Sequence, residues 1–444
     1  MTAATSIPSE ANAPARPGRG GPTDPSHDER LRRGIIHTEV SRGVAAVIVL
    51  GFLAAIYGIP VSQAIFEKKD GQDVRLAELF KHAPTRQRLH QFEDDLDQAS
   101  HAKAWTQPRL QELLTKRGRV GNKKAVVGQM GWLYYKPGIT YVGGPPFLDP
   151  EIMEARVRAS LEAGDPPVSP DPRKAVIAFA QALAKRGIKL VLFPVPDKAM
   201  LQPWELHGRG GMFADRPVPH NPSYEQFVRD VSAAGVAVFD PTPVALGQYD
   251  RARFLEQDTH WTPEWMEAVA HQLAVFVLEH VALPEPAEAP KWKRVATPIS
   301  RVGDIVDMLK LTDGQTVFTP QTVTAQQVQD AAGAEWEPDP KGDVLLLGDS
   351  FTNVFSLDPM GWGSAAGLGP QLAFALGRGV DVIAQNDSGA FATRQTLARE
   401  LGGTDDRHDR LTGKRVVIWE FASRELAVGD WKPVDWAAAM GERR

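Results

Sequence analysis

The sequence predicts an α/β fold with a mostly parallel sheet that has helices on both faces, preceded by one N-terminal transmembrane helix. Residues 344–347 form an apolar run without alternation, and residues 189–195 and 380–384 form two further, mostly apolar runs, as expected for strands buried on both faces of a parallel sheet. Helical patterns separate these runs, and strands that alternate with helices indicate parallel pairing. Residues 44–66 form an uncharged apolar stretch of 23 residues, which is long enough to span a bilayer.

Composition limits the classes of function. The chain has 444 residues, 43% hydrophobic and 24% charged, which is ordinary for a globular protein with two or three domains of about 100–200 residues. A net charge of -5 gives no sign of general nucleic-acid binding. Cysteine is absent, which excludes disulfides, a thiol nucleophile and cysteine metal sites. We expect no cofactor, no metal centre and no nucleic-acid partner.

The N-terminal segment predicts membrane attachment. Residues 1–43 are expected to form a disordered cytoplasmic tail, because their first part is rich in Pro, Gly, Ala and Ser. The transmembrane anchor follows at residues 44–66, and Pro60 weakens its far end. Positive residues precede the anchor and predict a cytoplasmic N-terminus with export of the remainder, namely Arg30, Arg32, Arg33 and Arg42.

A cleaved signal peptide is the alternative interpretation of this segment. The apolar stretch is long for a signal peptide, and so is the tail before it, which favours an uncleaved anchor. We therefore predict a single-pass protein of the inner membrane whose globular domain lies in the periplasm.

The rest of the chain divides into a helical linker at residues 67–125 and a globular domain at residues 126–444. Spaced apolar residues in the linker fit short amphipathic helices. In the domain, a cap residue followed by proline marks two helix starts, at Asp171-Pro172 and Thr262-Pro263. We expect helices at 171–187, 224–234, 262–281, 368–376 and 390–401, strands at 189–195, 236–239, 344–347, 380–384 and 415–421, and a strand outside the main sheet at 317–323.

A Gly-Asp-Ser turn follows one of the buried strands. Gly348 allows a tight turn, and Ser350 then lies just past the carboxyl end of the strand, where ligands bind in open α/β sheets. Ser350 is thus a candidate nucleophile. The alternative is that Asp349 and Ser350 only cap the next segment. Asp349 is expected to shape the turn rather than to react.

A serine nucleophile needs a base, usually His, and an acid that orients the imidazole. Asp258 and His260 supply this pair, and residues two apart point the same way in an extended segment. The pair directly precedes a helix start, so it is expected at the same edge of the sheet as Ser350. The alternatives are a surface His260 and a capping Asp258, because one Asp-x-His is plausible by chance among 11 histidines.

An acyl-transfer site also needs donors for the oxyanion. The backbone N–H of Ser350 is one candidate, and Asn353 and Asn386 are candidate side-chain donors. Arg394, about one helix turn beyond Asn386, is a candidate contact for a carboxylated or hydroxyl-rich substrate. A turn asparagine and an arginine on a solvated helix face are the alternatives for the last two.

Six motifs together resemble the SGNH hydrolase-like domain of the bacterial alginate O-acetyltransferase family. They occur in the family's order and cover about residues 126–426. In ordinary SGNH esterases the Gly-Asp-Ser comes first and the Asp/His pair last, so the reversed order resembles the permuted arrangement of the acetyltransferases. The motifs are Gly131-Trp132-Leu133-Tyr134-Tyr135, Val195-Pro196-Asp197-Lys198-Ala199, Asp258-Thr259-His260-Trp261, Gly303-Asp304-Ile305, Gly348-Asp349-Ser350-Phe351 and Val417-Ile418-Trp419-Glu420-Phe421.

The resemblance implies an O-acetyltransferase that moves acetyl groups onto hydroxyls of a bacterial exopolysaccharide, alginate-like or cellulose-like, in the periplasm through an acetyl-serine. It matches Asp258, His260 and Ser350 to the family's triad. It also implies two partners, the polysaccharide acceptor and a membrane-bound acyltransferase that supplies acetyl groups. The chain resembles the single-domain, membrane-anchored type, because few residues follow residue 426. Arg424 lies where the chain departs from the expected pattern and receives no role.

Two other functions stay open on the sequence alone. A carbohydrate esterase or deacetylase of the SGNH type would use the same residues with water as the acceptor. A non-catalytic polysaccharide-binding partner of an export complex would stack aromatic side chains on sugars, although Trp and Tyr are more often partly buried. Its candidates are Trp132, Tyr134, Tyr135 and Trp261.

Overall fold

The structure is a computed structural model that describes residues 41–81, 83, 85–208, 218–246, 252–286, 288–386, 389–401 and 409–441. The disordered tail expected at residues 1–43 therefore lies outside the described residues, except for its last three. The chain divides into two compact units, Met1–Gln98 and Ala99–Arg444. Each unit is described by itself.

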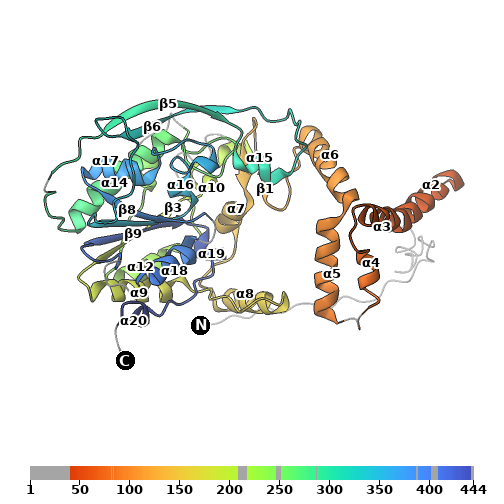
Figure 1. The fold of residues 1–444 in the computed structure, drawn as a ribbon, viewed down its shortest axis with the longest axis horizontal. Coiled ribbons are helices and arrows are strands. Elements are labelled where there is room, and N and C mark those ends of the chain that lie inside the picture. Colours follow the sequence, from red (N-terminus) through yellow and green to blue (C-terminus); the bar gives the residue numbers. More distant parts are fainter. Residues whose placement is uncertain are drawn as a thin grey trace, which may run out of the picture. The chain divides into compact units, whose positions relative to one another are not determined.

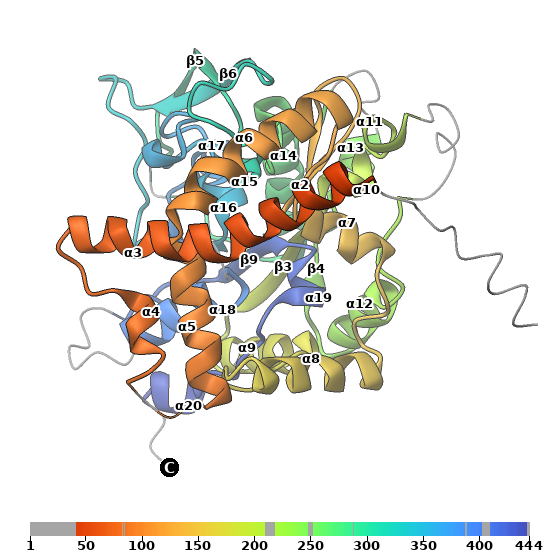
Figure 2. The same ribbon diagram turned by 90° about the vertical axis from the view of Figure 1, so that its right-hand side faces the viewer.

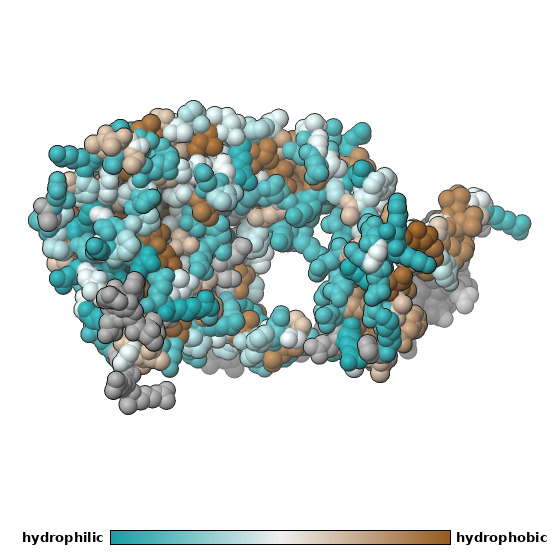
Figure 3. All heavy atoms as spheres, viewed as in Figure 1, coloured by the Kyte–Doolittle hydropathy of each residue, from teal (hydrophilic) through white to brown (hydrophobic). Residues whose placement is uncertain are grey.

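A long apolar helix dominates the first unit. Helix α2 (Arg42–Leu53) continues through a π-helical turn, η1 (Ala54–Gly58), into α3 (Ile59–Lys69). The 28 residues are long and apolar enough to cross a membrane, by length and composition, and hydrophobic side chains gather over α2 in Figure 3. The helix continues past Pro60, because the wider π turn before it accommodates a residue that lacks an N–H.

Two helices follow in the first unit, α4 (Arg75–Glu78) and α5 (Arg86–Ala99). The Arg75 side chain donates to the carbonyl of Asp95 at 2.9 Å and so joins α4 to α5. The short helices expected after the anchor are thus present. A third helix of the predicted linker, α6 (His101–Gly118), belongs to the second unit.

A five-stranded parallel sheet forms the centre of the second unit, in the order β4-β3-β9-β7-β8. This confirms the predicted parallel sheet. The central strands β7 and β9 are buried along their whole length, as their continuous apolar runs indicate. The strands are β3 (Lys189–Val195), β4 (Ala237–Val238), β7 (Val344–Gly348), β8 (Val380–Ala384) and β9 (Val416–Ala422).

Helices cover both faces of this sheet (Figure 1). One layer contains α14 (Pro263–His280) and α17 (Leu368–Leu376). The opposite layer contains α8 (Pro150–Glu162), α9 (Pro172–Ala184), α12 (Tyr224–Ala233), α18 (Gly389–Leu401) and α20 (Trp436–Ala439). Both predicted helix starts are capped as expected: Asp171 accepts from Arg173 N–H at 3.0 Å, and the Thr262 hydroxyl accepts from Trp265 N–H at 3.5 Å.

Two small antiparallel ribbons accompany the main sheet. Strand β1 (Ala125–Val127) pairs with β2 (Leu133–Tyr135), and β5 (Lys293–Arg301) pairs with β6 (Gln321–Gln329). Strand β6 confirms a strand outside the main sheet, but it starts later than the predicted range 317–323. Strand β5 was not predicted from the sequence. The β5–β6 ribbon lies at one margin of the domain in both views (Figure 2).

The remaining helices are short. They are α7 (Lys136–Gly143), α10 (Lys198–Leu201), α11 (Trp204–His207), α13 (Thr242–Leu246), α15 (Asp304–Leu309), α16 (Ser350–Asn353), the 3₁₀ turn η2 (Asp358–Met360) and α19 (Glu425–Val428). Several of them sit directly after strands and so hold the loops at the carboxyl edge of the sheet.

The aromatic residues considered as sugar platforms lie largely inside. Trp132, Tyr134 and Trp261 are buried in the core, where Trp261 packs against Phe193, Trp265 and Phe351. These three rings are therefore not the exposed sugar platforms that the non-catalytic alternative requires, and their burial is the commoner outcome named for Trp and Tyr. Burial of a large aromatic ring removes much apolar surface from water and so contributes favourable free energy to folding.

Candidate functional site

Asp258 and His260 lie in a tight loop that leads into α14. Phe254 pairs with Trp261 across this loop, and the Leu255 N–H donates to the His260 carbonyl at 3.1 Å. The Thr262 hydroxyl closes the loop by donating to the Ala252 carbonyl at 2.9 Å. These bonds fix the backbone on both sides of His260.

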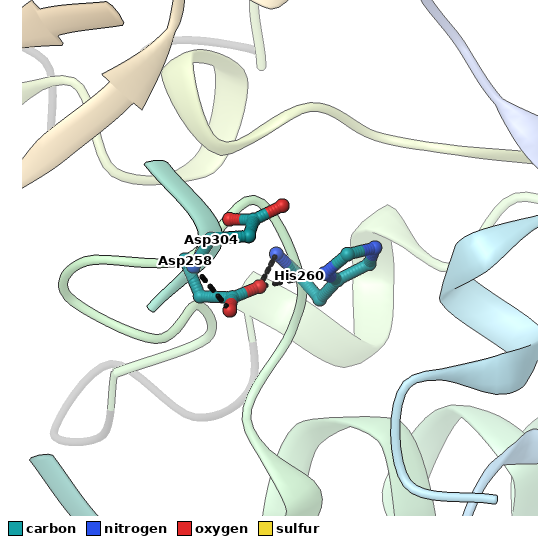
Figure 4. A group of neighbouring side chains, drawn as sticks. All are labelled: Asp258, His260 and Asp304. Atoms are coloured by element: carbon teal, nitrogen blue, oxygen red, sulfur yellow. Dashed lines mark hydrogen bonds and ion pairs between the residues drawn. The ribbon is translucent and has the colours of Figure 1, made fainter. Parts of the chain in front are cut away.

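The two predicted site residues form a buried pair. Nδ1 of His260 lies 2.6 Å from Oδ1 of Asp258 (Figure 4), and the His260 backbone N–H donates to the same oxygen at 3.1 Å. Because a carboxylate oxygen accepts, Nδ1 carries the proton and Nε2 is left as the acceptor. Nε2 is buried and has no hydrogen-bond partner among the described residues.

The His260 ring meets the Gly-Asp-Ser turn. It packs edge-on against Phe351, with ring centroids 4.9 Å apart, and Phe351 directly follows Ser350. Ser350 is half-buried and begins α16 immediately after β7. Its backbone N–H has no acceptor among the described residues. The structure thus brings the three predicted triad residues to one edge of the sheet.

Asp349 holds this turn in place. One carboxylate oxygen accepts from the Phe351 N–H at 2.8 Å, and the other accepts from the Ala422 N–H on β9 at 2.9 Å. Asp349 is therefore both the cap of α16 and the link between the turn and the neighbouring strand, as its expected role in shaping the turn requires.

Glu420 lies beneath the turn in the middle of β9. Its Oε2 accepts from the Asp349 N–H at 3.0 Å and from the Thr352 hydroxyl at 2.7 Å. Burial, together with the negative charge of Asp349, raises the pKa of Glu420 well above its usual value. The sequence did carry a signal for this residue, since one acid interrupts an apolar strand.

The second oxygen of Asp258 is held by two further donors. Oδ2 accepts from the Asp304 N–H and from the Trp362 indole N–H, each at 2.9 Å. Asp304 in turn accepts from the Thr259 N–H at 2.7 Å. The Gly303-Asp304 motif marked this site in the sequence, whereas Trp362 had no local signal.

Burial and charge set the protonation of the pair in opposite directions. Burial raises the pKa of Asp258, but the hydrogen bond and charge of His260 outweigh it and hold that pKa below its usual value. Burial lowers the pKa of His260, but the hydrogen bond and charge of Asp258 outweigh it and raise that pKa above 6.5. Burial beside Asp258 raises the pKa of Asp304 to about 6.

Asp258, His260 and Asp304 also offer atoms within 4.8 Å of one another that suit a metal ion (Figure 4). The contacts fit hydrogen bonding better than metal binding. The 2.6 Å separation of Nδ1 and Oδ1 is that of a direct charge-assisted bond. The Asp258 and Asp304 oxygens named above accept protein N–H groups, so their lone pairs are engaged.

Lys198 supports the loop of Asp258 from below. Its buried ammonium donates to the carbonyls of Asp258 at 2.6 Å, Leu133 at 2.8 Å and Glu256 at 3.3 Å. Burial lowers the pKa of Lys198 to about 7. The Pro-Asp-Lys motif contained this residue, but its partners lie far away in the sequence.

Arg424, which received no role from the sequence, pairs with Asp197, the acid of that motif. Its guanidinium donates to Asp197 at 2.9 Å, and its backbone N–H donates to the second oxygen of Asp197 at 3.0 Å. The guanidinium lies over the rings of Tyr135 and Phe351, 5.1 Å and 5.7 Å from their centroids. This places a buried cation next to the Ser350 turn.

Two of the three additional site candidates lie together. Asn353 Nδ2 donates to Asn386 Oδ1 at 2.9 Å, and the Gln385 N–H bonds to the Gly348 carbonyl at 3.0 Å. Both asparagines therefore lie at the carboxyl edge of β7 and β8, beside Ser350.

Arg394 lies elsewhere. It is fully buried, its guanidinium is 5.0 Å from the centroid of Trp419, and it donates to the Lys432 carbonyl at 3.2 Å. These contacts belong to the layer of α18 and α20, not to the Ser350 edge. Arg394 also lines a pocket of about 330 Å³ there, with Trp431 and Trp436.

Comparisons with known proteins give the family and the fold. The family model described as "SGNH hydrolase-like domain, acetyltransferase AlgX" matches residues 125–423. The probable alginate O-acetylase AlgJ of Pseudomonas aeruginosa is 27% identical over 345 residues, which cover 74% of this chain and 78% of the relative. The protein of the same name from Azotobacter vinelandii is 28% identical over 276 residues, covering 59% of this chain and 64% of the relative.

A solved structure shares the fold. The O-acetyltransferase domain of Pseudomonas putida AlgJ matches with a TM-score of 0.50 and 21% identity, over 72% of this chain and 99% of that domain. The match supports the SGNH-like fold, with its parallel sheet between helices.

Proposed function

The chain belongs to the AlgX family of SGNH hydrolase-like acetyltransferase domains, and on that premise we propose that it is an O-acetyltransferase acting on hydroxyls of an exopolysaccharide. The names of the curated relatives, probable alginate O-acetylases, support alginate as the first acceptor to test. The observation that carries the proposal is the buried Asp258–His260 pair, whose free Nε2 belongs to a ring packed beside the Ser350 turn.

The first half-reaction forms an acetyl-serine. Nε2 of His260 accepts the proton of the Ser350 hydroxyl while the oxygen attacks the acetyl carbonyl of the donor. The imidazolium then gives this proton to the departing donor group. Asp258 stabilises the imidazolium and keeps the ring in the required tautomer, which its 2.6 Å contact to Nδ1 favours.

The second half-reaction runs the same steps with the sugar. Nε2 takes the proton of a sugar hydroxyl while the oxygen of that hydroxyl attacks the acetyl carbonyl of the acetyl-serine. The bond between the acetyl group and Ser350 then breaks, and the Ser350 oxygen receives the proton from Nε2. Both tetrahedral intermediates carry an oxyanion that needs donors. The Ser350 N–H and the Asn353–Asn386 pair at the same edge are the candidates.

The location follows from the apolar helix. We propose that Arg42–Lys69 anchors the chain in the inner membrane and that the acetyltransferase domain works in the periplasm. The described residues contain one candidate span, and a single span offers no route for acetyl groups across the bilayer. A separate membrane-bound acyltransferase is therefore the proposed donor partner. This scheme keeps residues 1–43 in the cytoplasm, 67–125 as a linker and 126–444 as the catalytic domain.

Replacement of the proposed nucleophile tests the function. We expect Ser350→Ala to abolish O-acetylation of exported polymer in cells whose own copy of the gene is deleted. Ser300→Ala, an exposed serine on β5, serves as the matched control and should leave acetylation unchanged. Normal acetylation with Ser350→Ala would refute the proposal.

An esterase would use the same acyl-enzyme with water as the acceptor. The two reactions are separated by incubating the purified chain with an acetyl donor and an oligosaccharide and measuring acetylated sugar against free acetate. We expect acetylated sugar to exceed the acetate released. A chain that binds polymer but never labels at Ser350 with a serine-reactive acyl probe would instead be a non-catalytic partner.

A further inference from the structure

Helix α6 (His101–Gly118; Figure 1) contacts the domain through side chains of its C-terminal half. Thr115 in this half is buried. Gln111 donates to the Val120 carbonyl at 3.0 Å, and the Glu112 carboxylate accepts a hydrogen bond from the Thr312 hydroxyl. The orientation of α6 about its own axis is therefore fixed.

The side of α6 opposite these contacts carries large apolar residues in water. Trp105 is 63% exposed, Leu110 and Leu113 are each 54% exposed, and Leu114 is 39% exposed. At 3.6 residues per turn, these four positions fall on one half of the helix. Lys116, Arg109 and Arg117 lie between them around the helix, so this half of α6 mixes apolar and basic side chains. Single exposed apolar residues are ordinary, but four on one side of a helix mark an interaction surface.

Positive charge accompanies these apolar residues. Residues 101–124 contain seven Lys and Arg residues against one Glu, in a chain whose net charge is -5. That single acid, Glu112, is engaged by Thr312. The guanidinium of Arg109 lies 4.6 Å from the centroid of the Trp105 ring. The exposed cations are Arg109, Lys116, Arg117, Arg119, Lys123 and Lys124.

We propose that this face of α6 rests on the anionic lipid surface of the membrane that holds the anchor. A helix face on which Trp and Leu are interleaved with Lys and Arg fits the boundary between headgroups and acyl chains. Long Lys and Arg side chains there extend their charges toward the headgroups. An acidic polysaccharide would match the charge but not the Leu side chains, and an ordinary protein partner would match the Leu side chains but not the charge excess.

Chain connectivity supports the same occupant. Only residues 70–100 separate the end of the apolar helix from α6, so the anchor holds α6 at high effective concentration next to lipid. Weak individual contacts are then enough to keep the helix on the surface. The inference depends on the anchor being in the membrane and is independent of whether acetyl transfer occurs.

The absence of cysteine allows a direct test with the full chain. Leu113→Cys carries an environment-sensitive fluorophore, and Leu161→Cys on α8, 56% exposed, is the matched control. Each labelled chain is placed in nanodiscs of phosphatidylcholine alone and in nanodiscs that also contain phosphatidylglycerol. We expect blue-shifted emission and quenching by doxyl-labelled lipid at position 113 with phosphatidylglycerol, and water-like emission at position 161 in both.

Charge variants complete the test. Lys116→Glu combined with Arg117→Glu should abolish the blue shift at position 113, as should about 1 M salt, which shortens the screening length to about 3 Å. A water-like label at position 113 in both lipids overturns the proposal, and so does equal lipid contact without anionic headgroups. A blue shift that appears only after membrane proteins are added assigns the face to a protein partner and also overturns it.

Discussion

At the residue scale, the carboxylate of Asp258 uses both oxygens in four hydrogen bonds. Oδ1 accepts from the backbone and the ring of His260, and Oδ2 accepts from Asp304 and Trp362. A buried anion is costly unless donors surround it, and this set compensates the charge. The arrangement keeps the acid ionised and the imidazole in one orientation.

Asp258→Asn should therefore reduce acetyl transfer far more than it reduces stability. The amide lacks the charge and favours the wrong tautomer of His260, a change that costs about 10⁴-fold in rate in serine protease triads. The rate of acetyl transfer by the purified chain, with the melting temperature as a folding check, measures the effect. Asp307→Asn on α15, an exposed carboxylate, is the control; equal rates in both variants would contradict the role of Asp258.

The pH dependence of the reaction should report His260. A general base must be neutral, so the rate should rise with pH through a His260 pKa that lies above 6.5. In Asp258→Asn the largest interactions that raise this pKa are gone, although the charges of Asp304 and Asp349 remain, and burial still lowers it. The residual activity should therefore rise at lower pH than the wild-type activity does. The pH–rate profile of acetyl-serine formation, measured for the wild type and for Asp258→Asn, tests this. If the rise in rate occurred at the same pH in both, the titrating group would not be His260.

Glu420 makes a stability prediction. Its folded-state pKa lies well above 4.5, so the native state holds this proton more tightly than the unfolded state does. The stabilisation from protonated Glu420 is complete at pH values below the pKa of this group in the unfolded state. It decreases as the pH rises from there and is lost as the pH passes the folded-state pKa. Glu420→Gln keeps an acceptor for Asp349 and Thr352 and carries no charge, so its melting temperature should exceed that of the wild type at about pH 8.

The comparison at about pH 5 provides the control for this prediction, because the advantage of Glu420→Gln should shrink there. Glu420→Leu removes the acceptor from two buried donors, which should cost about 1–3 kcal/mol of unfolding free energy at either pH. If Glu420→Gln melted below the wild type at about pH 8, the carboxyl would have to be ionised in the native state.

At the element scale, the site depends on close approach of loops that the strands carry. Gly303 begins α15, and a Cβ there would lie 2.3 Å from the backbone carbonyl of Gln257. Gly348 ends β7, and a Cβ there would lie 2.1 Å from the Thr352 hydroxyl. Each glycine lets one loop pass directly over the next, which places Asp304 under Asp258 and α16 after β7.

Gly303→Ala should displace the Asp258 loop, because the new methyl group meets rigid backbone and not a flexible side chain. Overpacking of this kind costs about 1–3 kcal/mol, and the rate of acetyl transfer should fall with it. Gly314→Ala, where a Cβ meets nothing within 4 Å, is the matched control. A Gly303→Ala chain with unchanged melting temperature and rate would show that the loop can yield.

At the scale of the whole molecule, the active edge collects residues that are far apart in the chain. The Asp258–His260 loop precedes α14, and the Ser350 turn follows β7, yet His260 packs on Phe351. All five strands of the sheet run parallel, so their carboxyl ends and the following loops share one edge. The Asp/His motif precedes the Gly-Asp-Ser motif in this chain, the reverse of their order in ordinary SGNH esterases. Both motifs can still meet, because the sheet brings them to one edge whatever their order in the sequence.

The membrane topology is a prediction at the same scale. In spheroplasts, a membrane-impermeant maleimide should label Leu161→Cys in an otherwise cysteine-free chain, because the domain that carries this residue is proposed to lie in the periplasm. Ser6→Cys in the N-terminal tail should react only after the membrane is permeabilised. Labelling of position 6 in intact spheroplasts, or protection of position 161, would reverse the proposed orientation.

The sequence by itself determined the elements whose pattern is local. Mostly apolar runs predicted β3, β7 and β8 to within one residue, and Asp-Pro and Thr-Pro marked the starts of α9 and α14. The chemical types and order of its motifs also predicted the family and the Asp258–His260 pair. These features depend on neighbours within a few residues, which a single sequence displays.

Only the tertiary structure decided which side chains complete the site. Trp362 and Asp304 reach Asp258 across 104 and 46 residues, and Arg424 reaches Asp197 across 227. The structure also shows that Arg394 and Trp261, which were candidates for contacts with substrate, are buried in the core. Partners for a buried polar group are selected by packing in three dimensions, because burial makes each unmet hydrogen bond costly wherever its partner lies in the chain.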